Sequence, residues 1–162
     1  MCIRDRVWVL GDDIDTDIII PTEYLALKTI EDMKQYGFSP LRPELAGQIQ
    51  PGDIIVAGKN FGCGSSREQA PEVIKALGIP CIIAKSFARI FYRNALNNGL
   101  LLLEQPELHD VVKEGDTITV TVNEDVDYNG KKYPIASLPE NLMEIIEAGG
   151  LVKAMRKRNG LD

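Results

Sequence analysis

Two successive strand–turn–helix units constrain the fold of this chain more than any other feature of its sequence. Residues 53–57 (DIIVA) and 81–84 (CIIA) are short apolar runs of the kind that form buried strands. The first run precedes a segment with apolar residues at helical spacing. The second precedes a helix that is expected to run from its N-cap Ser86 to the stop signal Gly99. A third apolar run at 100–103 predicts a further interior strand, so this part of the chain is built from βα units.

The period of the hydrophobic pattern changes in the second half of the chain. Residues 117–122 (TITVTV) alternate as a half-buried antiparallel strand does, and the Asn-Gly pair at 129–130 is a strong hairpin signal. A final helix is expected from its cap Ser137 to the glycines at 149–150, and residues 7–10 read as an early strand. We therefore predict a layered α/β domain rather than a doubly wound sheet.

Composition limits the class of protein. A chain of 162 residues with 44% hydrophobic content suits one domain with a sizeable core. Its net charge of −6 argues against a nucleic-acid partner, and the basic residues of the 155–162 segment are interpreted as a solvated tail. Because no apolar run reaches the roughly 20 residues of a membrane span and the start lacks an apolar signal core, we expect a cytoplasmic protein without membrane contact.

The run FGCGSSRE at 61–68 places two hydroxyls and a guanidinium where a strand meets a helix. Gly62 and Gly64 permit positive φ and close backbone approach. Free N–H groups at a helix start favour an anion, and Arg67 can hold a carboxylate through two parallel hydrogen bonds. This combination indicates a carboxylate-binding loop.

The same run also fits a plainer interpretation. Ser65 and Ser66 each stand three residues before a residue that could complete a capping box. Pro71 favours a regular helix that starts near it, which would leave the preceding residues as an irregular loop. A helix cap and a ligand loop therefore both stand as interpretations.

The three cysteines and the single histidine exclude several kinds of site. Cys2, Cys63 and Cys81 form no CxxC pair, so the sequence supports neither a disulfide framework nor a zinc site. Iron–sulfur clusters usually need three or four thiolates, so Cys63 cannot hold one alone. It fits either a small interior residue or a third active-site group. His109 has no evident partner and is interpreted as a surface residue, which argues against a Ser-His-Asp triad.

A second polar cluster, DDIDTD at 12–17, lies between two apolar runs. It does not match a calcium loop, because Ile18 occupies the position of the required glycine. The side chains could satisfy their own backbone in a turn, or one carboxylate could be functional. The segment 22–43, with a modest helix at about 29–36, could form a long loop over a site.

A basic line marks the second predicted helix. Lys85, Arg89 and Arg93 recur at four-residue steps, which suits either a solvated face or contact with a partner subunit or anionic substrate. The apolar stripe of this helix is expected to consist of Phe87, Ile90 and Phe91.

Three motifs in this order resemble the small subunit of 3-isopropylmalate dehydratase, a member of the aconitase superfamily. They are DTDIIIP at 15–21, NFGCGSSRE at 60–68 and SFARIFYRN at 86–94, and the likeness extends over residues 7–154. The resemblance implies a single swivelling β/β/α three-layer domain, like the C-terminal domain of aconitase. Residues 1–6 do not resemble the usual family start and are interpreted as an extraneous segment.

The resemblance also implies a division of labour between two chains. A separately encoded large subunit would hold a 4Fe-4S cluster whose open iron takes the substrate hydroxyl, so no cofactor or metal is expected on this chain. The small subunit would bring the base and the carboxylate-binding groups to a small hydroxy dicarboxylate. Alone, the chain is expected to be inactive and to form homo-oligomers through the face meant for its partner.

The resemblance assigns roles residue by residue. Ser65 matches the serine that abstracts the proton next to a carboxylate, and Asp17 matches an acidic catalytic residue. Ser66 and Arg67 match substrate-carboxylate contacts. The loop in which substrate choice resides corresponds to Tyr24, Leu25, Ala26, Leu27 and Lys28. The partner-interface candidates are Lys85, Arg89 and Arg93.

These roles predict a hydro-lyase that interconverts 2-isopropylmalate and 3-isopropylmalate through isopropylmaleate in leucine biosynthesis. Ala26 and Leu27 offer an apolar surface suited to an isopropyl group, which favours this substrate. Alternatives are the small subunit of homoaconitase, with Lys28 serving an extra carboxylate, or of a dimethylmalate-type dehydratase. An alternative of another class is a non-catalytic module that binds a small carboxylate.

Overall fold

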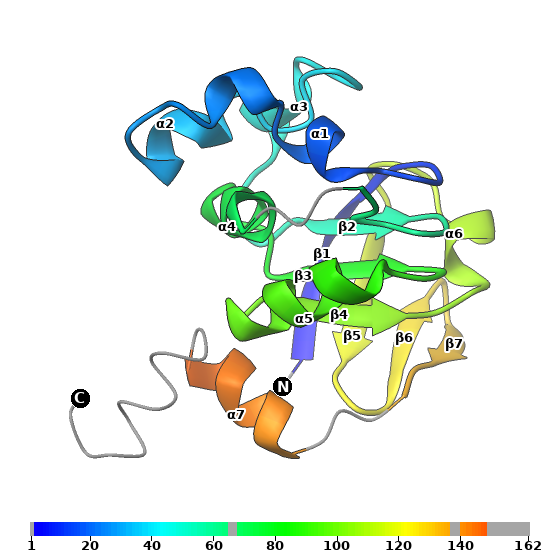
Figure 1. Ribbon diagram of the computed structural model, residues 1–162. Coiled ribbons are helices and arrows are strands. Elements are labelled where there is room, and N and C mark those ends of the chain that lie inside the picture. The colour runs from blue at the N-terminus through cyan, green and yellow to red at the C-terminus, as the bar shows by residue number, and fades with distance from the viewer. Residues whose placement is uncertain (1, 65–67, 137–139, 149–162) are drawn as a thin grey trace.

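The computed structural model describes residues 2–64, 68–136 and 140–148. Over these residues the strands form one mixed seven-stranded sheet in the order β4-β3-β2-β1-β5-β6-β7 (Figure 1). The strands are β1 Cys2–Val9, β2 Ile54–Ala57, β3 Cys81–Ala84, β4 Leu101–Glu104, β5 Thr117–Thr121, β6 Asp125–Tyr128 and β7 Lys131–Pro134. The layered α/β architecture predicted from the sequence is confirmed.

The half of the sheet formed by β1 to β4 is parallel. Ile54 pairs with Val7 on one side and with Cys81 on the other, and Cys81 pairs in turn with Leu101. All residues of β2 and β3 are buried, a pattern typical of parallel strands covered on both faces. The strands predicted at 53–57, 81–84 and 100–103 are confirmed to within one residue at each end.

β1 joins the parallel half to an antiparallel half. Its C-terminal part, Val7 to Val9, pairs with β2, whereas residues 2–6 pair with β5. Sequence reasoning sets the start of the domain at residue 7, but the structure includes residues 2–6 in the sheet. The reason is that pairing with β5 satisfies backbone groups that a loose segment would leave to solvent.

The antiparallel half confirms the alternating pattern. β5 exposes and buries its residues in turn, with Ile118 and Val120 facing the core. Asn129 and Gly130 connect β6 to β7 with φ values of 52° and 82°, the positive φ that a two-residue type I′ turn requires.

Helices cover the sheet in two groups (Figure 1). α4, α5 and α7 lie along one side of it, and α1, α2 and α3 form a separate group beyond α4, which α1 and α2 both contact. The helices are α1 Thr16–Ile19, the 3₁₀ turn η1 Thr22–Tyr24, α2 Ile30–Lys34, α3 Leu45–Gln48, α4 Gln69–Ala76, α5 Arg89–Asn97, α6 Leu108–Val111 and α7 Glu140–Ala148.

The predicted helix starts are less accurate than the strands. α4 begins at Gln69, two residues before the predicted start, and thereby keeps Pro71 in its first turn. α5 begins at Arg89, and its N-cap is Ala88 rather than Ser86, whose hydroxyl accepts a hydrogen bond from a neighbouring loop instead. The predicted cap Ser137 lies outside the described residues.

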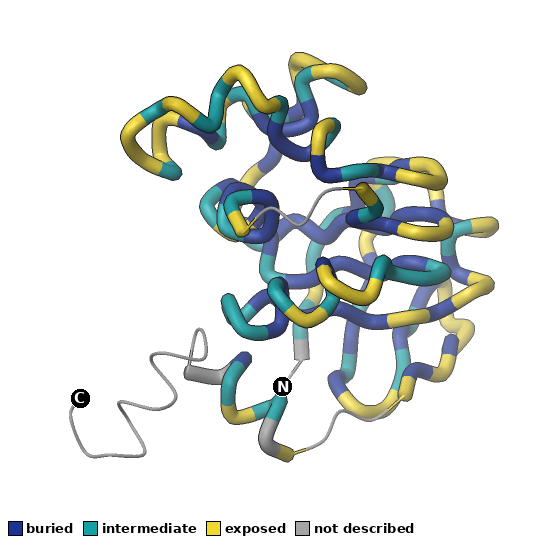
Figure 2. Tube along the Cα trace, viewed as in Figure 1, coloured by how far each residue is buried: buried dark blue, intermediate teal, exposed yellow. Residues whose placement is uncertain are grey.

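The core lies between the parallel strands and the helices that cover them (Figure 2). Phe61 and Phe91 are buried, and their rings meet edge to face with centroids 5.4 Å apart. Ile90, predicted to share the apolar stripe of α5, is instead 57% exposed. It lies next to Arg89 on the outer side of the helix, so the stripe is narrower than the sequence suggests.

A buried carboxylate fastens β1 to the turn before β2. Asp53 is 1% exposed and accepts hydrogen bonds from the Trp8 indole at 2.8 Å, the Arg6 Nε at 3.0 Å and the Gln50 N–H at 2.8 Å. Burial by itself raises the pKa of this carboxyl, but the bonds from Gln50, Trp8 and Arg6 outweigh it, so the pKa of Asp53 lies below its usual range. The charged form is therefore the one that the fold stabilises.

We predict that Asp53→Asn lowers the free energy of unfolding by about 2 kcal/mol at neutral pH, the cost of losing charge-assisted hydrogen bonds in the interior. Because the pKa is depressed in the folded state, this stabilisation is complete above the unfolded-state pKa of about 3.9 and is lost as the pH falls further. Urea unfolding from pH 7 to pH 2 should show the two proteins converging below about pH 4. Glu31→Gln, at an exposed carboxylate, is the control, and an equal loss in both variants would contradict the prediction.

Candidate active site at the strand ends

The three sequence motifs meet at the carboxyl ends of β1, β2 and β3, the edge at which open α/β sheets bind ligands. The loop after β2, residues 58–64, lies against the loop after β1. The Gly62 N–H donates to the Ile14 carbonyl at 2.7 Å, and the Thr16 N–H donates to the Cys63 carbonyl at 2.9 Å. Two motifs far apart in sequence are thus bonded backbone to backbone.

The other side of the same loop is bonded to the segment before α5. The Phe61 N–H donates to the Ser86 carbonyl at 3.1 Å, and the Phe61 carbonyl accepts from the Ala88 N–H at 2.9 Å. Phe61 and Phe87 form an isolated parallel bridge, and the Asn60 N–H donates to the Ser86 hydroxyl at 2.8 Å. The central loop therefore continues the parallel pairing of β2 and β3 past the strand ends.

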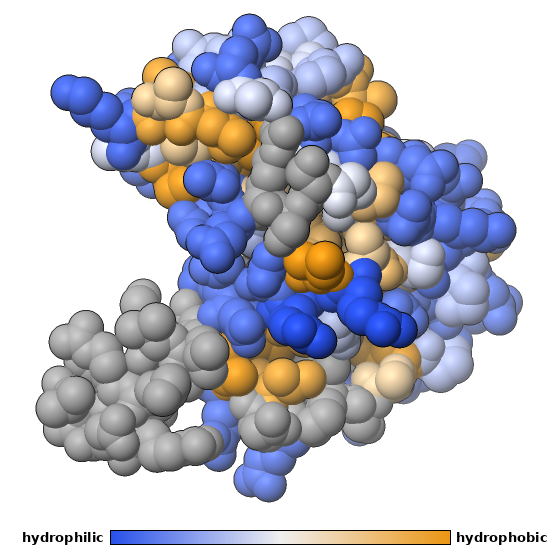
Figure 3. All heavy atoms as spheres, viewed as in Figure 1, coloured by the Kyte–Doolittle hydropathy of each residue, from blue (hydrophilic) through white to orange (hydrophobic). Residues whose placement is uncertain are grey.

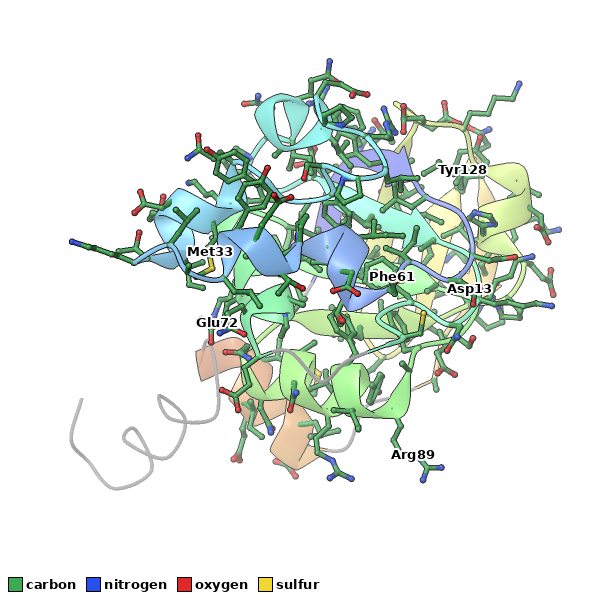
Figure 4. The ribbon with its side chains drawn as sticks, turned by 45° about the horizontal axis from the view of Figure 1, so that its top comes forward. Asp13, Met33, Phe61, Glu72, Arg89 and Tyr128 are labelled. Carbon is green, nitrogen blue, oxygen red and sulfur yellow. The ribbon has the colours of Figure 1, made fainter. Side chains whose placement is uncertain are left out.

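Two aspartates of the acidic cluster at 12–17 hold the loops together. The Asp12 carboxylate accepts the Lys59 N–H at 2.7 Å, and Asp13 accepts the Asn60 side-chain amide at 3.1 Å. Figure 4 shows Asp13 on the same side of the molecule as the strand-end loops. The prediction that these side chains satisfy their own backbone in a turn is therefore wrong for these two residues, because they accept hydrogen bonds from another loop.

The remaining two aspartates of this cluster differ from each other. Asp15 is the N-cap of α1 and accepts the Ile18 N–H at 2.9 Å. Asp17, in the first turn of α1, is exposed, and its Oδ1 lies 3.5 Å from the Thr22 hydroxyl. Asp15 is half-buried, whereas Asp17 is exposed. Its catalytic role stays a prediction.

The glycines of the central loop serve close packing. Gly62 has a φ of 84°, and a Cβ atom there would lie 2.2 Å from Cγ of Phe91. Gly64 has a φ of 93°, but the nearest atom to a Cβ there would be the Cβ of Asp15, at an ordinary contact distance of 3.4 Å. The close approach expected from the sequence is present at Gly62, and its partner is the first turn of α5. This contact sets how near α5 lies to the loop.

Ser65, Ser66 and Arg67 lie outside the described residues, so their predicted roles stay predictions. On either side of them, the description stops at Gly64 and resumes at Glu68. Glu68 is the N-cap of α4, which begins at Gln69. The predicted capping box on either serine likewise lies outside the described residues.

Cys63 is half-buried between the two loops. Burial raises the pKa of its thiol, and the negative charges of Asp15 and Asp13 raise the pKa further. A thiol held protonated is a poor nucleophile, so the structure favours the small-residue interpretation of Cys63 over a reactive one. Cys63 and Cys81 are both free thiols.

His109 is half-buried, and its interpretation as a surface residue without a partner is wrong. Its ring Nε2 lies 2.7 Å from the Leu10 carbonyl, and its Nδ1 lies 3.9 Å from the Asp110 carboxylate. α6 thereby reaches back to the end of β1. No local pattern could have revealed this contact, because the two residues are 99 positions apart.

The residues of the predicted basic line have different surroundings. The Lys85 ammonium donates to Asp110 at 2.7 Å, and this hydrogen bond lowers the pKa of the Asp110 carboxyl. Arg89 and Arg93 are exposed on α5, and neither forms an ion pair with any residue that the structure describes. Figure 4 shows Arg89 pointing away from the body of the molecule.

The loop predicted to select the substrate follows α1. Tyr24, Leu25 and Leu27 are half-buried and pack against the core, whereas Ala26 and Lys28 are exposed. The part of the chain that the structure describes holds no group of three or more histidines, cysteines or acidic residues that could bind a metal ion. Among its helices, none is long and apolar enough to cross a membrane.

We predict that Gly62→Ala destabilises the protein by about 1–3 kcal/mol more than Gly64→Ala, the usual cost of overpacking. Both substitutions place alanine at positive φ, so the difference isolates the clash with Phe91. Urea unfolding of the two variants measures it. Equal losses would show that α5 moves aside freely.

Comparison with known proteins agrees with this geometry. The family model for the aconitase C-terminal domain matches residues 23–108. The 3-isopropylmalate dehydratase small subunit of Lachnospira eligens is 80% identical over 97% of this chain and 96% of its own length. The isopropylmalate/citramalate isomerase small subunit of Methanocaldococcus jannaschii is 46% identical, over 96% of this chain and 95% of its own.

A solved structure shows the same fold. The crystal structure of a 3-isopropylmalate dehydratase chain from Methanocaldococcus jannaschii superposes with a TM-score of 0.92 at 40% identity, and the match covers 99% of this chain and 97% of that one. The aconitase C-terminal-domain fold predicted from the motifs is therefore confirmed. With its three motifs joined at one edge of the sheet, this chain belongs to the family of 3-isopropylmalate dehydratase small subunits.

Proposed function

We propose that this chain is the small subunit of a heteromeric hydro-lyase that interconverts 2-isopropylmalate and 3-isopropylmalate through isopropylmaleate. The observation that carries the proposal is the joining of the 11–17, 58–64 and 85–88 loops at the carboxyl ends of three parallel strands. Residues 65–67 follow Gly64 in the sequence, and we propose that they act at this edge together with Asp17. The family relationship supports the same activity.

The chemistry that we propose divides between two chains. A 4Fe-4S cluster on the large subunit would act as a Lewis acid toward the substrate hydroxyl. The proposal places the cluster on the partner, because the names of the related chains as small subunits imply a second, large subunit. On this chain, Ser65 would take the proton next to a carboxylate, while Ser66 and Arg67 would bind that carboxylate through charge-assisted hydrogen bonds.

An unassisted serine hydroxyl is a poor base, so its ionised form needs stabilisation by nearby donors. A guanidinium at residue 67 and backbone N–H groups near the start of α4 are suited to that task. Asp17 is exposed in the first turn of α1, and we propose that it takes part in the proton transfer. The free Cys63 and Cys81 thiols fit a reducing compartment, and we propose that the enzyme acts in the cytoplasm.

For substrate selection we propose the 24–28 loop. Ala26 is exposed and Leu27 half-buried, which gives this loop an apolar surface suited to an isopropyl group. Lys28 is also exposed and can remain in solvent. The loop therefore favours a branched alkyl substituent over a third carboxylate.

For the partner surface we propose the outer side of α5. Ile90 is 57% exposed between Arg89 and Arg93, and these arginines have no carboxylate partner among the described residues. Figure 3 shows hydrophobic and strongly hydrophilic side chains side by side on this face. Lys85 contributes less to this proposed surface, because its ammonium is already paired with Asp110. A large subunit that completes the site would contact α5 here.

The activity is tested by mixing this chain with the reconstituted large subunit from the same source. We expect hydration of isopropylmaleate and little hydration of homoaconitate, measured by the loss of absorbance of the conjugated double bond. A preference for homoaconitate would indicate that Lys28 contacts the substrate. Binding of the carboxylates without turnover would favour a non-catalytic module instead.

We predict that Ser65→Ala lowers turnover of isopropylmaleate by at least about 100-fold, the scale of general-base catalysis, without preventing assembly. Steady-state rates of the reconstituted complex and sedimentation of the mixture measure the two properties. Thr119→Ala on β5, which removes a hydroxyl from the antiparallel half of the sheet, is the matched control. Wild-type turnover in Ser65→Ala would contradict the assignment of Ser65 as the base.

We predict that Arg93→Glu weakens association with the large subunit by at least about tenfold, because it reverses a charge at the proposed interface. Titration calorimetry at low and high salt measures the affinity and its electrostatic share. Lys131→Glu, an equal charge reversal on the β6–β7 hairpin, should leave the affinity unchanged. An effect of both variants alike would place the interface elsewhere.

A further inference from the structure

The 24–28 loop has little regular structure of its own to hold it. It lies between η1, three residues long, and α2, five residues long. Its backbone forms a turn that begins at Tyr24, where the Leu27 N–H donates to the Tyr24 carbonyl at 3.1 Å. The position of Tyr24 therefore decides where the exposed Ala26 and Lys28 lie.

Tyr24 is in turn held by one aromatic contact. Its ring stacks on the ring of Tyr36 with centroids 4.0 Å apart and planes 2° from parallel. Tyr24 precedes α2 in the sequence and Tyr36 follows it, so the stack joins the two segments that flank this helix. Both rings are half-buried against the core.

Tyr36 is fixed by the two residues that follow it. Gly37 is packed so closely on α4 that a Cβ atom there would lie 3.2 Å from Leu77 and 3.3 Å from Val73. Phe38 is fully buried at a φ of 60°, a conformation that a bulky residue rarely adopts. Its N–H donates to the Ile19 carbonyl at 3.0 Å, at the end of α1.

The anchors of Tyr36 belong to the two helices that flank the proposed site. α4 follows the 65–67 segment, and α1 carries Asp17. Figure 4 shows α2, with Met33, lying beside α4, with Glu72, so the covering segment and the helix after the motif form one packed unit. A displacement of Tyr36 relative to the site is therefore resisted on two sides.

We propose that Tyr36 is a positioning residue for substrate selection. Through its stack on Tyr24, it transmits the position of α1 and α4 to the 24–28 loop and so fixes the apolar surface that receives the substrate's alkyl group. The proposal rests on the proposed function, because it needs the loop to contact substrate. Tyr36 itself acts only through Tyr24.

Two variants of Tyr36 separate the stacked ring from the hydroxyl. In the reconstituted complex, Tyr36→Leu should raise the KM for isopropylmaleate about two- to tenfold, the factor that corresponds to one aromatic pair, with kcat changed little. Tyr36→Phe keeps the ring and should behave as the wild type. Tyr133→Leu, which removes a buried aromatic ring from β7, controls for a general loss of stability and should leave KM unchanged.

Limited trypsin digestion of the chain alone provides a readout that does not depend on activity. Cleavage after the exposed Lys28 should be about two- to tenfold faster in Tyr36→Leu than in Tyr36→Phe or Tyr133→Leu. Unchanged cleavage, an unchanged KM in Tyr36→Leu, or an equal rise of KM in Tyr133→Leu would overturn the proposal. If the wild-type complex does not turn over isopropylmaleate, the proposed function fails, whereas the digestion still tests the stack by itself.

Discussion

The double backbone pairing of the loop after β2 is the constraint on which the site depends. At Phe61 both the N–H and the carbonyl are bonded to the segment before α5, and one residue later Gly62 is bonded to the loop after β1. Since these bonds extend the parallel order of the strands, the loops cannot shift separately. The loop that leads to the proposed catalytic segment is therefore held in place by hydrogen bonds, which suits chemistry that requires close control of position.

The acidic residues near this edge have separate tasks. Asp12 and Asp13 join loops, and Asp15 begins α1, so their charges are taken up by N–H groups. Asp53 does the same at the far end of β2, where it is buried. Asp17 is exposed in the first turn of α1, with its Oδ1 3.5 Å from the Thr22 hydroxyl.

The sequence predicts the strands better than the helix starts. The apolar runs at β2, β3 and β4 and the Asn129-Gly130 turn determine local conformation by themselves, and the structure agrees with them. The prediction for Ser86 is wrong because a serine hydroxyl before an apolar stripe can accept a hydrogen bond either from its own helix or from another segment. Here it accepts from the Asn60 N–H. Ile90 misleads because its helical spacing cannot tell which residues at the border of a stripe are covered.

The sequence by itself determined the family, the order of the elements and the residue types offered to a substrate, because each depends on short motifs and local periodicity. Only the tertiary structure decided which of these residues are already engaged. Lys85 is paired with Asp110, His109 with the Leu10 carbonyl, and Tyr24 with Tyr36, through contacts between residues that are 25, 99 and 12 positions apart. Such contacts depend on how helices pack over the sheet, and no local pattern specifies that packing.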